Sequence, residues 1–290
     1  MIRSLAIATI FMATCALSTG AEAKKHPKTA THAAYANRAD AMEFANDLAA
    51  RRDLDPAWVR QSIGQARLLP AVQRLVLPPA KGTAKNWQAY RARFIEPVRV
   101  RAGLRFWQEH ARTLERAEQE FGVPQEIIVG ILGVETIYGQ HMGSFGVLEA
   151  LASLAFFYPP RAEFFRGELE QFLLLACENG ISPLSVKGSY AGAIGIPQFM
   201  PSSQRRFAVD FDGDDRIDLR QSYPDAIGSV ARFLQQHGWQ TGEPVAVPAT
   251  VSGDPTALLA IGIKPTLTVS ELAAQGVSAV ADGDRAAALI

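Results

Sequence analysis

Apolar residues recur at the three- and four-residue spacing of an α-helix along most of the chain up to about residue 239. The first such segments place their apolar positions at Met42, Phe44, Ala45 and Leu48, and then at Trp58, Val59 and Ile63. Asp55 and Pro56 stand between the two segments, as a capping residue and a proline in the first turn of a new helix. The pattern predicts long helices joined by short loops.

Later segments continue this pattern and then leave it. The run "VRAGLRFWQEHARTLERAEQEFG" has helical spacing and ends at Gly122, and Pro124 opens the next predicted helix. After about Trp239, prolines, glycines and short β-branched runs replace the helical spacing, which predicts a small strand-containing subdomain with one short helix. The predicted fold class is mainly α with a small β subdomain.

The first 23 residues have the pattern of a cleaved secretory signal peptide, with a positively charged start, an apolar run and a small-residue exit at Ala23. The alternative is a lipoprotein signal in which Cys15 carries a lipid and attaches the protein to a membrane. Residues 24–37 are small, polar and basic, and predict a flexible leader. Cleavage after Ala23 leaves Cys177 as the only cysteine, so the mature chain could form no internal disulfide.

The overall composition is that of a folded soluble protein, with 48% apolar and 20% charged residues. Lysine plus arginine and aspartate plus glutamate are equal at 29 each, so the formal net charge is zero. A dedicated nucleic-acid-binding protein would carry an excess of basic residues. The balance therefore argues against nucleic acid as a partner.

One acidic residue lies on the apolar face of the helix predicted to begin near Pro124. Ile128, Ile131 or Leu132, and Glu135 fall on that face at helical spacing. Burial without a cationic partner raises the pKa of a carboxyl group, and a carboxyl that stays protonated near neutral pH can act as the general acid that cleaves a glycosidic bond. The alternative is a glutamate whose head group lies in solvent at a helix end, or pairs with an arginine.

Two glycine-rich regions predict close approach of another backbone or a ligand. Gly130, Gly133 and Gly139 remove side-chain bulk around the glutamate. The segment "KGSYAGAIGIPQFMPSS", residues 187–203, supplies hydroxyl and amide groups that suit a sugar's hydroxyl and acetamido groups, at Ser189, Tyr190 and Gln198. The alternative is a tight loop between helices whose small residues serve packing.

The segment "DFDGDDRID" has the spacing of a calcium-binding EF-hand loop. Asp210, Asp212 and Asp214 occupy positions 1, 3 and 5, and Arg216 would contribute its backbone carbonyl at position 7. Asp215 stands where glycine is usual, and aspartate tolerates the left-handed conformation better than most residues. The alternative is a solvated acidic turn that caps the next helix.

Several of these motifs occur together, and in the same order, in one known family. "GVETIYG", "GSYAGAIGIPQFMPSS" and "AVDFDGDDRIDL", followed by "PDAIGSVARFLQQHGW", resemble the lytic murein transglycosylases of the membrane-bound B family. The likeness runs from "NWQAYRARFIEP" at residue 86 to Trp239. It implies an N-terminal helical domain (residues 38–115), a lysozyme-like catalytic core with the EF-hand-like loop (residues 116–240) and a small β-containing subdomain (residues 241–290).

The resemblance also implies which residues form the site. Glu135 would be the only catalytic acid and base, and the sugar-binding residues would be Ser189, Gln198, Tyr90, Tyr190 and Arg161. Calcium would have a structural role with Asp225 as its last ligand, and no organic cofactor is implied. The implied partner is the glycan strand of peptidoglycan. The implied location is the periplasm, or the outer membrane if Cys15 is lipidated.

The reaction that the resemblance implies needs only one carboxylate, whereas most glycosidases use two that lie about 5–9.5 Å apart. Glu149, Glu163, Glu168 and Glu170 lie in amphipathic sequence and are expected on the solvated surface, so no second acid is expected opposite Glu135. Glu135 would protonate the oxygen between N-acetylmuramic acid and N-acetylglucosamine, and the 2-acetamido group would stabilise the developing cation. The same residue would then take a proton from the muramoyl C6 hydroxyl, which closes onto C1 as a 1,6-anhydro end.

Two features depart from the family pattern. The chain ends at "ADGDRAAALI", where relatives continue with a tyrosine-rich segment, so the β subdomain is expected to be a truncated one. Phe233 stands where relatives often carry a tyrosine. The alternatives to an active transglycosylase are a non-catalytic peptidoglycan-binding or scaffold protein with a lysozyme-like fold, and a hydrolysing muramidase.

Overall fold

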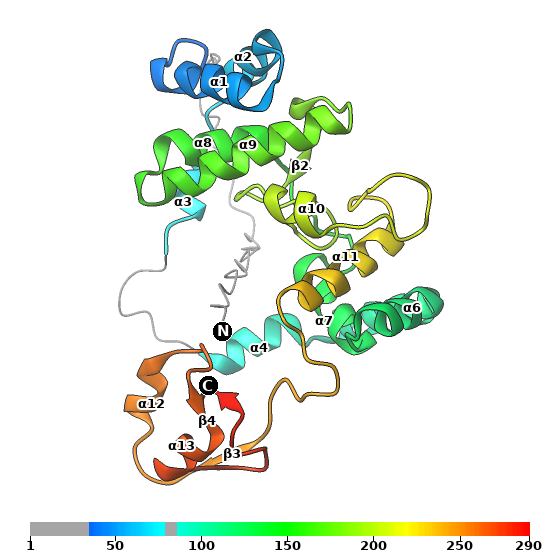
Figure 1. Ribbon diagram of the computed structural model, residues 1–290, viewed down its shortest axis with the longest axis vertical. Helices are drawn as coiled ribbons and strands as arrows, with labels where there is room; N and C mark the ends of the chain where they lie inside the picture. Colours follow the sequence, from blue (N-terminus) through cyan, green and yellow to red (C-terminus); the bar gives the residue numbers. More distant parts are fainter. Residues whose placement is uncertain (1–34, 79–85) are drawn as a thin grey trace, which may run out of the picture. The chain divides into compact units, whose positions relative to one another are not determined.

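The structure of the protein, a computed structural model, describes residues 35–78 and 86–290 (Figure 1). The predicted signal peptide, Cys15 and most of the predicted leader lie outside the described residues. The chain divides into two compact units, one that ends at Trp239 and one that covers Gln240–Ile290.

The first unit is built from helices, which confirms the predicted mainly-α class. They are α1 (Ala39–Arg52), α2 (Pro56–Gln65), α3 (Pro70–Leu75), α4 (Trp87–Phe94), α5 (Pro97–Glu109), α6 (Ala111–Phe121), α7 (Gln125–Thr136), α8 (Val147–Phe157), α9 (Ala162–Glu178), α10 (Pro201–Phe207) and α11 (Tyr223–Gln236). Short 3-10 helices cover Pro159–Arg161 and Pro183–Ser185, and β1 (Phe145–Gly146) pairs antiparallel with β2 (Lys187–Gly188).

Local signals in the sequence set several of these helix ends. Asp55 caps α2, because its Oδ1 accepts a hydrogen bond of 2.8 Å from the backbone N–H of Ala57. Gly122 ends α6 in the left-handed conformation, with φ at 71°. The run that precedes Gly122 was predicted as continuous, but it breaks at His110, whose ring lies 4.5 Å from that of Phe106 and so packs against the helix before it.

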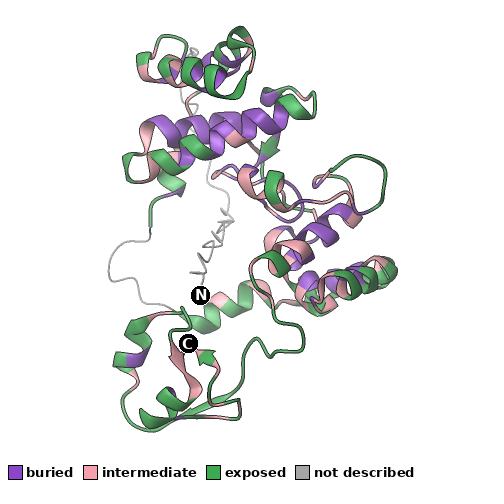
Figure 2. Ribbon diagram, viewed as in Figure 1, coloured by how far each residue is buried: buried purple, intermediate pink, exposed green. Residues whose placement is uncertain are grey.

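One hydrophobic cluster joins α1, α2 and α3 to α8 and α9. Helix α8 is its centre, because every residue from Val147 to Phe156 is buried, as the colouring of this helix in Figure 2 shows. A helix that is mostly apolar around its whole circumference is stable only inside a protein. The fold therefore places α8 between the N-terminal helices and the rest of the first unit.

The prediction of a flexible leader over residues 24–37 is wrong at Tyr35. Tyr35 is completely buried in the cluster around α8, and its hydroxyl donates a hydrogen bond of 3.3 Å to the Oγ of Ser153. Its ring also lies 5.7 Å from that of Phe156. Because these contacts are distant in sequence, the polar composition of the segment around Tyr35 concealed its role in the core.

A second hydrophobic cluster joins α5, α6 and α7 to α11. Ile128 and Leu132 on α7 are fully buried in it, as the predicted apolar stripe requires. The domain boundary expected between residues 115 and 116 falls inside α6. Helices α5 and α6 thus share a core with α7.

Three of the four glutamates expected on the solvated surface are buried, and the prediction for them was wrong. Glu149, Glu168 and Glu170 are 6%, 5% and 8% exposed, whereas Glu163 is exposed as expected. A buried carboxylate requires partners that replace its water. Each of the three has such partners, and they come from distant parts of the chain.

Arginines provide those partners for two of the glutamates. The Nε of Arg67 lies 2.6 Å from the carboxylate of Glu149. Arg51 and Arg52 contact the carboxylate of Glu170 at 2.8 and 2.6 Å. These two arginines lower the pKa of Glu170 although its burial opposes them. The pairs tie the N-terminal helices to α8 and α9.

The second unit contains two small antiparallel pairs and two helices. β3 (Ala249–Val251) pairs with β5 (Val277–Ala279), and β4 (Leu267–Thr268) pairs with β6 (Ala286–Ala287). The helices are α12 (Thr256–Ile261) and α13 (Val269–Ala274), where only one was predicted. Local caps explain both, since Asp254 accepts from Thr256 N, and Thr268 and Glu271 form a capping box.

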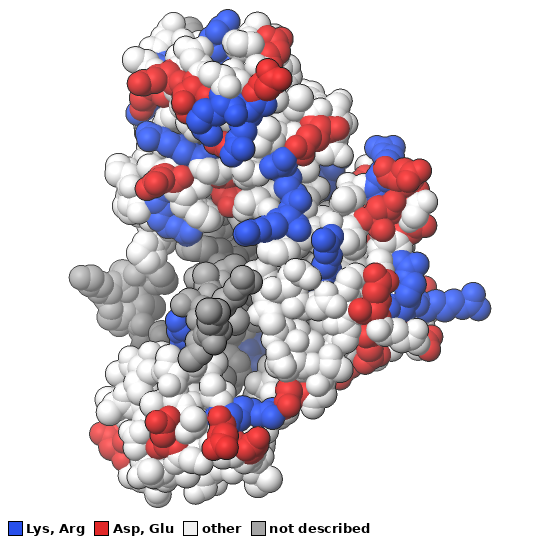
Figure 3. All heavy atoms as spheres, viewed as in Figure 1, with Lys and Arg blue, Asp and Glu red and all other residues white. Residues whose placement is uncertain are grey.

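Charged side chains of both signs occur side by side on the face of the molecule that Figure 3 shows, in keeping with the zero formal net charge. Over residues 35–78 and 86–290, the structure contains no helix with the length and apolar character needed to span a membrane.

The glycines around Glu135 differ in the atoms that a β-carbon at each position would meet. Gly133 lies against Tyr138, whose buried ring is stacked on that of Phe106 at 4.8 Å. A β-carbon at position 133 would lie 2.8 Å from the Cζ atom of Tyr138. At Gly130 a β-carbon would meet nothing within 4 Å. The glycine at position 133 therefore makes room for the side chain of Tyr138, which belongs to the protein and not to a ligand.

We expect Gly133→Ala to lower the free energy of unfolding by about 1–3 kcal/mol, the usual cost of overpacking a core. Gly130→Ala, on the same helix, is the matched control. It is expected to be neutral or to stabilise by up to about 1 kcal/mol, because alanine has the higher helix propensity. Urea denaturation measures both variants, and equal stabilities would contradict the packing of Tyr138 described above.

Candidate active site

The chain turns sharply directly after Glu135, the penultimate residue of α7. Three consecutive residues are left-handed, with φ of 51° at Ile137, 56° at Tyr138 and 85° at Gly139. The Oγ1 of Thr136 holds this turn, because it accepts from the backbone N–H of Gly139 and donates to the carbonyl of Ile196, both at 2.8 Å. The end of α7 is thereby fixed against the 187–203 segment.

Glu135 lines a cavity of about 190 Å³ in the first unit. Helix α7 contributes Ile131, Val134 and Glu135 to its wall, and α9 contributes Phe164 and Phe165. The 187–203 segment and α11 supply much of the remainder. Both hydrophobic clusters therefore reach the cavity.

The structure brings four of the five predicted sugar-binding residues to this cavity, together with Glu135. They are Ser189, Gln198, Tyr190 and Arg161. Tyr90 is not among the lining residues, and Phe94 on the same helix lines the cavity in its place, with its ring 5.0 Å from that of Tyr90. The sequence did not predict that Phe94 lines the cavity, because the apolar residues of α4 do not form one clear face.

Hydrogen bonds fix the backbone of the 187–203 segment at the cavity. Gln198 is left-handed, with φ of 52°, and its Nε2 donates to the carbonyls of Gly195 at 2.8 Å and Met142 at 3.2 Å. The Oγ of Ser189, which is 8% exposed, accepts from the backbone N–H of Ala193 at 3.0 Å. These hydrogen bonds hold both side chains in place at the cavity wall.

Aromatic contacts shape the remaining wall. The guanidinium of Arg161 lies 4.2 Å from the ring centroid of Phe164 and 5.4 Å from that of Phe165, which orients it by cation–π attraction. Burial raises the pKa of Tyr190, so that its hydroxyl stays protonated and can donate a hydrogen bond.

The carboxyl group of Glu135 is partly buried and has no hydrogen-bond or ion-pair partner among the residues that the structure describes. Burial raises its pKa from 4.5 to about 7. Among the described residues that line the cavity, it is also the only carboxylic acid. The group therefore carries a proton over part of the neutral range, as a general acid must.

The acidic loop gathers three of its predicted ligands. One carboxylate oxygen from each of Asp210, Asp212 and Asp214 lies within 4.8 Å of the others. Backbone N–H groups of Gly213, Asp215 and Asp214 lower the pKa of Asp210 although desolvation opposes them. Asp215 adopts the left-handed conformation with φ of 66°, as predicted for this position. Clustered oxygen donors of this kind suit a hard cation such as calcium.

Asp225 does not belong to that group of three. It is 1% exposed, and its two oxygens accept hydrogen bonds of 2.7 Å from the backbone N–H groups of Phe211 and Asp218. Desolvation raises its pKa, and the charges of Asp212 and Asp210 act in the same direction. In this structure Asp225 joins the two ends of the loop from its place in the first turn of α11.

Known proteins share this fold and these motifs. Residues 36–289 match the family model described as the transglycosylase SLT domain. The chain belongs to this family. It is 44% identical over 254 residues to the membrane-bound lytic murein transglycosylase B of Escherichia coli K12. The aligned region covers 84% of this chain and 69% of that relative.

Solved structures agree with this assignment. The soluble lytic transglycosylase SltB1 of Pseudomonas aeruginosa aligns with a TM-score of 0.80 at 44% identity, over 84% of this chain and 82% of its own. The Escherichia coli lytic transglycosylase Slt35, in complex with calcium, aligns with a TM-score of 0.77 at 41% identity, over 89% of this chain and 80% of its own. The lysozyme-like fold and the enzyme class expected from the sequence, a lytic transglycosylase that cleaves peptidoglycan, are confirmed.

We expect the free energy of unfolding to fall as the pH rises from 4.5 to about 7, because the folded protein holds the Glu135 proton more tightly than the unfolded chain does. This contribution is complete below pH 4.5 and is lost as the pH rises through about 7. A tenfold difference in proton affinity corresponds to about 1.4 kcal/mol, so the loss reaches up to about 3 kcal/mol. Urea denaturation across this range should show the decline in wild type and a flatter profile in Glu135→Gln; parallel profiles would refute the assignment.

Proposed function

We propose that Glu135 is both the general acid and the general base of the lytic transglycosylase reaction in this protein. One observation carries the proposal: a single carboxylic acid, with a pKa raised to about 7 by burial, lies in a cavity with hydroxyl, amide and aromatic groups. Such groups suit the polar edges and apolar faces of a sugar.

In the first step, Glu135 donates its proton to the oxygen that joins N-acetylmuramic acid to N-acetylglucosamine. The C1–O bond breaks, and the 2-acetamido group of the muramoyl residue stabilises the cation that develops at C1. Glu135, now a carboxylate, accepts the proton of the C6 hydroxyl, and the C6 oxygen bonds to C1. The products are an N-acetylglucosamine end and a 1,6-anhydromuramoyl end, and Glu135 regains its proton without consuming water.

The substrate would be a glycan strand of peptidoglycan. SltB3 of Pseudomonas aeruginosa, 28% identical to this chain with a TM-score of 0.68, has been solved in complex with NAG-anhNAM-pentapeptide. By analogy, Ser189, Gln198, Tyr190 and Arg161 would contact the sugars beside Glu135. Tyr90 would contribute next to Phe94, at the edge of the cavity.

We expect Glu135→Gln to lower the release of anhydro-muropeptides from purified sacculi by about 10²–10⁴-fold, the usual contribution of a general acid or base. Glu126→Gln is the matched control, because Glu126 is an exposed glutamate in the first turn of the same helix. Mass spectrometry of the products gives the readout. Anhydro products from Glu135→Gln at the wild-type rate would contradict the proposed role, and reducing ends from wild type would indicate a hydrolysing muramidase.

We also propose that the acidic loop binds calcium in a structural role. Asp210, Asp212, Asp214 and the backbone carbonyl of Arg216 would hold the ion, and Asp225 would close the loop behind them. The close packing of the three carboxylates supports this, because their mutual repulsion is relieved by a cation. A relative of this chain, Slt35, has been solved with calcium.

Calcium at about 100 times its dissociation constant should stabilise the folded protein by about 2.7 kcal/mol and raise its melting temperature accordingly. Asp214→Asn should remove most of this increase, since it removes a charged ligand. Asp254→Asn, which alters an exposed capping aspartate in the second unit, should retain it. Thermal unfolding with millimolar calcium and with a chelator makes the comparison, and identical wild-type melting temperatures would argue against a calcium site.

The proposed location is the periplasm, where peptidoglycan lies. The signal-peptide pattern of residues 1–23 supports export across the inner membrane. The relative in Escherichia coli is named a membrane-bound enzyme. Attachment of this chain to the outer membrane would require a lipid on Cys15.

A further inference from the structure

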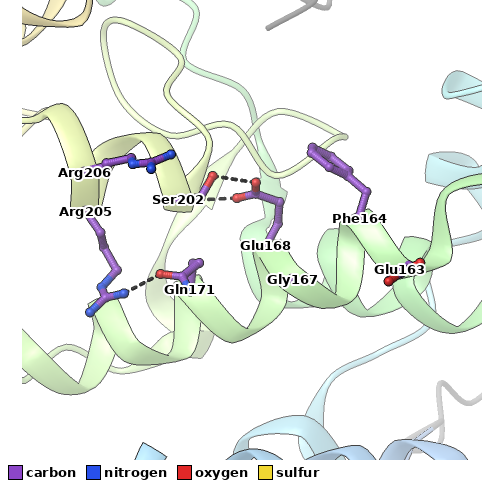
Figure 4. Close-up of a pocket in the computed structure, with 8 residues that line it drawn as sticks. All are labelled: Glu163, Phe164, Gly167, Glu168, Gln171, Ser202, Arg205 and Arg206. Carbon is purple, nitrogen blue, oxygen red and sulfur yellow. Dashed lines mark hydrogen bonds between the residues drawn. The ribbon is translucent and has the colours of Figure 1, made fainter. Parts of the chain in front are cut away.

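Glu168 is buried at the contact between α9 and α10, and both of its carboxylate oxygens are engaged there. Its Oε1 accepts a hydrogen bond of 2.6 Å from the Oγ of Ser202, and its Oε2 accepts one of 3.0 Å from the backbone N–H of Ser202 (Figure 4). Only 5% of the residue is exposed. Two hydrogen bonds to one carboxylate, away from water, make a strong and directional contact.

The carboxylate takes the place of a helix cap. Helix α10 begins at Pro201, and its N-cap residue Met200 provides no side-chain hydrogen bond. The N–H groups in the first turn of a helix have no partner within the helix, so they need one from elsewhere. Glu168 supplies that partner from α9, and thereby fixes where α10 begins.

This contact connects two walls of the active-site cavity. On α9, Phe164 and Phe165 line the cavity one helical turn before Glu168. On the other side, Gln198 and Met200 line it directly before α10. The hydrogen bonds between Glu168 and Ser202 therefore join the aromatic wall to the wall that carries Gln198.

The segment that carries Gln198 has further hydrogen bonds within its own turn and to other parts of the chain. Ile194 and Phe199 exchange backbone hydrogen bonds of 2.8 and 3.0 Å across the turn that holds Gln198. Thr136 donates to the carbonyl of Ile196. The first pair closes the turn on itself, and Thr136 fixes it to α7, while the backbone N–H of Ile196 donates to the carbonyl of Leu219 at 2.7 Å. Glu168 fixes the segment after the turn to α9.

We propose that Glu168 is a positioning residue for sugar binding: through Ser202 it sets the separation between the Phe164–Phe165 wall and Gln198. Glu168 does not take part in proton transfer, because its oxygens are occupied by Ser202. This inference rests on the proposed function of the cavity. A shift of about 1 Å in a substrate-positioning group can cost up to about 10²-fold in rate, so a small displacement of the Gln198 wall is measurable.

The test compares Glu168→Ala and Glu168→Gln with Glu149→Ala, all measured on soluble peptidoglycan strands. Glu149 is the matched control, since it is equally buried and hydrogen-bonded, at 6% exposure, but neither its helix α8 nor its partner Arg67 lines the cavity. We expect Glu168→Ala to raise KM about tenfold with kcat within about twofold of wild type, as for the loss of uniform binding. Glu168→Gln keeps one acceptor oxygen and should recover most of the affinity. Glu149→Ala should lower the melting temperature and leave KM unchanged.

A second variant keeps the test decisive if Glu168→Ala does not fold. Ser202→Ala removes the hydroxyl donor and retains the backbone N–H, so it should raise KM about threefold. An independent readout is calorimetric binding of an N-acetylglucosamine oligosaccharide to Glu135→Gln, with and without Glu168→Ala, where about tenfold weaker binding is expected.

The two hypotheses fail in different ways. If Glu135→Gln is inactive but both Glu168→Ala and Ser202→Ala keep the wild-type KM and affinity, the positioning role is refuted and the catalytic proposal stands. If Glu135→Gln is as active as wild type, the proposed function itself is refuted.

Discussion

The raised pKa of Glu135 depends on a carboxyl group that is partly buried without a positive charge beside it. The other buried glutamates of the first unit differ from Glu135, because the carboxylate of each contacts hydrogen-bond donors of the protein. Glu149 and Glu170 contact arginines, and Glu168 accepts two hydrogen bonds from Ser202. Glu135 has no such partner among the described residues, and burial raises its pKa to about 7.

The cavity exists because two separately packed groups of helices meet at it. One cluster contains α8 and α9, and the other contains α7 and α11. The 187–203 segment contributes to both, since Ile194 packs in the first cluster and Ile196 in the second. Residues that line the cavity are therefore carried by different cores, and the hydrogen bonds of Thr136 and Glu168 connect the segments that carry them.

Local features of the sequence predicted the elements that carry the candidate site. The burial of several residues was not predicted, because it depends on contacts between residues far apart in the sequence. The helix that bears Glu135 and the loop that bears Ser189 and Gln198 follow from apolar spacing and motif order. The burial of Glu149 and Glu168 depends on Arg67 and Ser202, which lie 82 and 34 residues away in the chain. No periodicity within a helix reveals such pairs, and Tyr35 was misjudged for the same reason.

Most of the described non-glycine residues with a strained backbone conformation lie beside the cavity. Of the five described non-glycine residues with positive φ, Ile137, Tyr138 and Gln198 border the site, and the other two are aspartates, which tolerate that conformation. Such conformations cost about 1–2 kcal/mol per residue. These three residues therefore store strain beside the cavity, which lowers the resistance of the fold to heat.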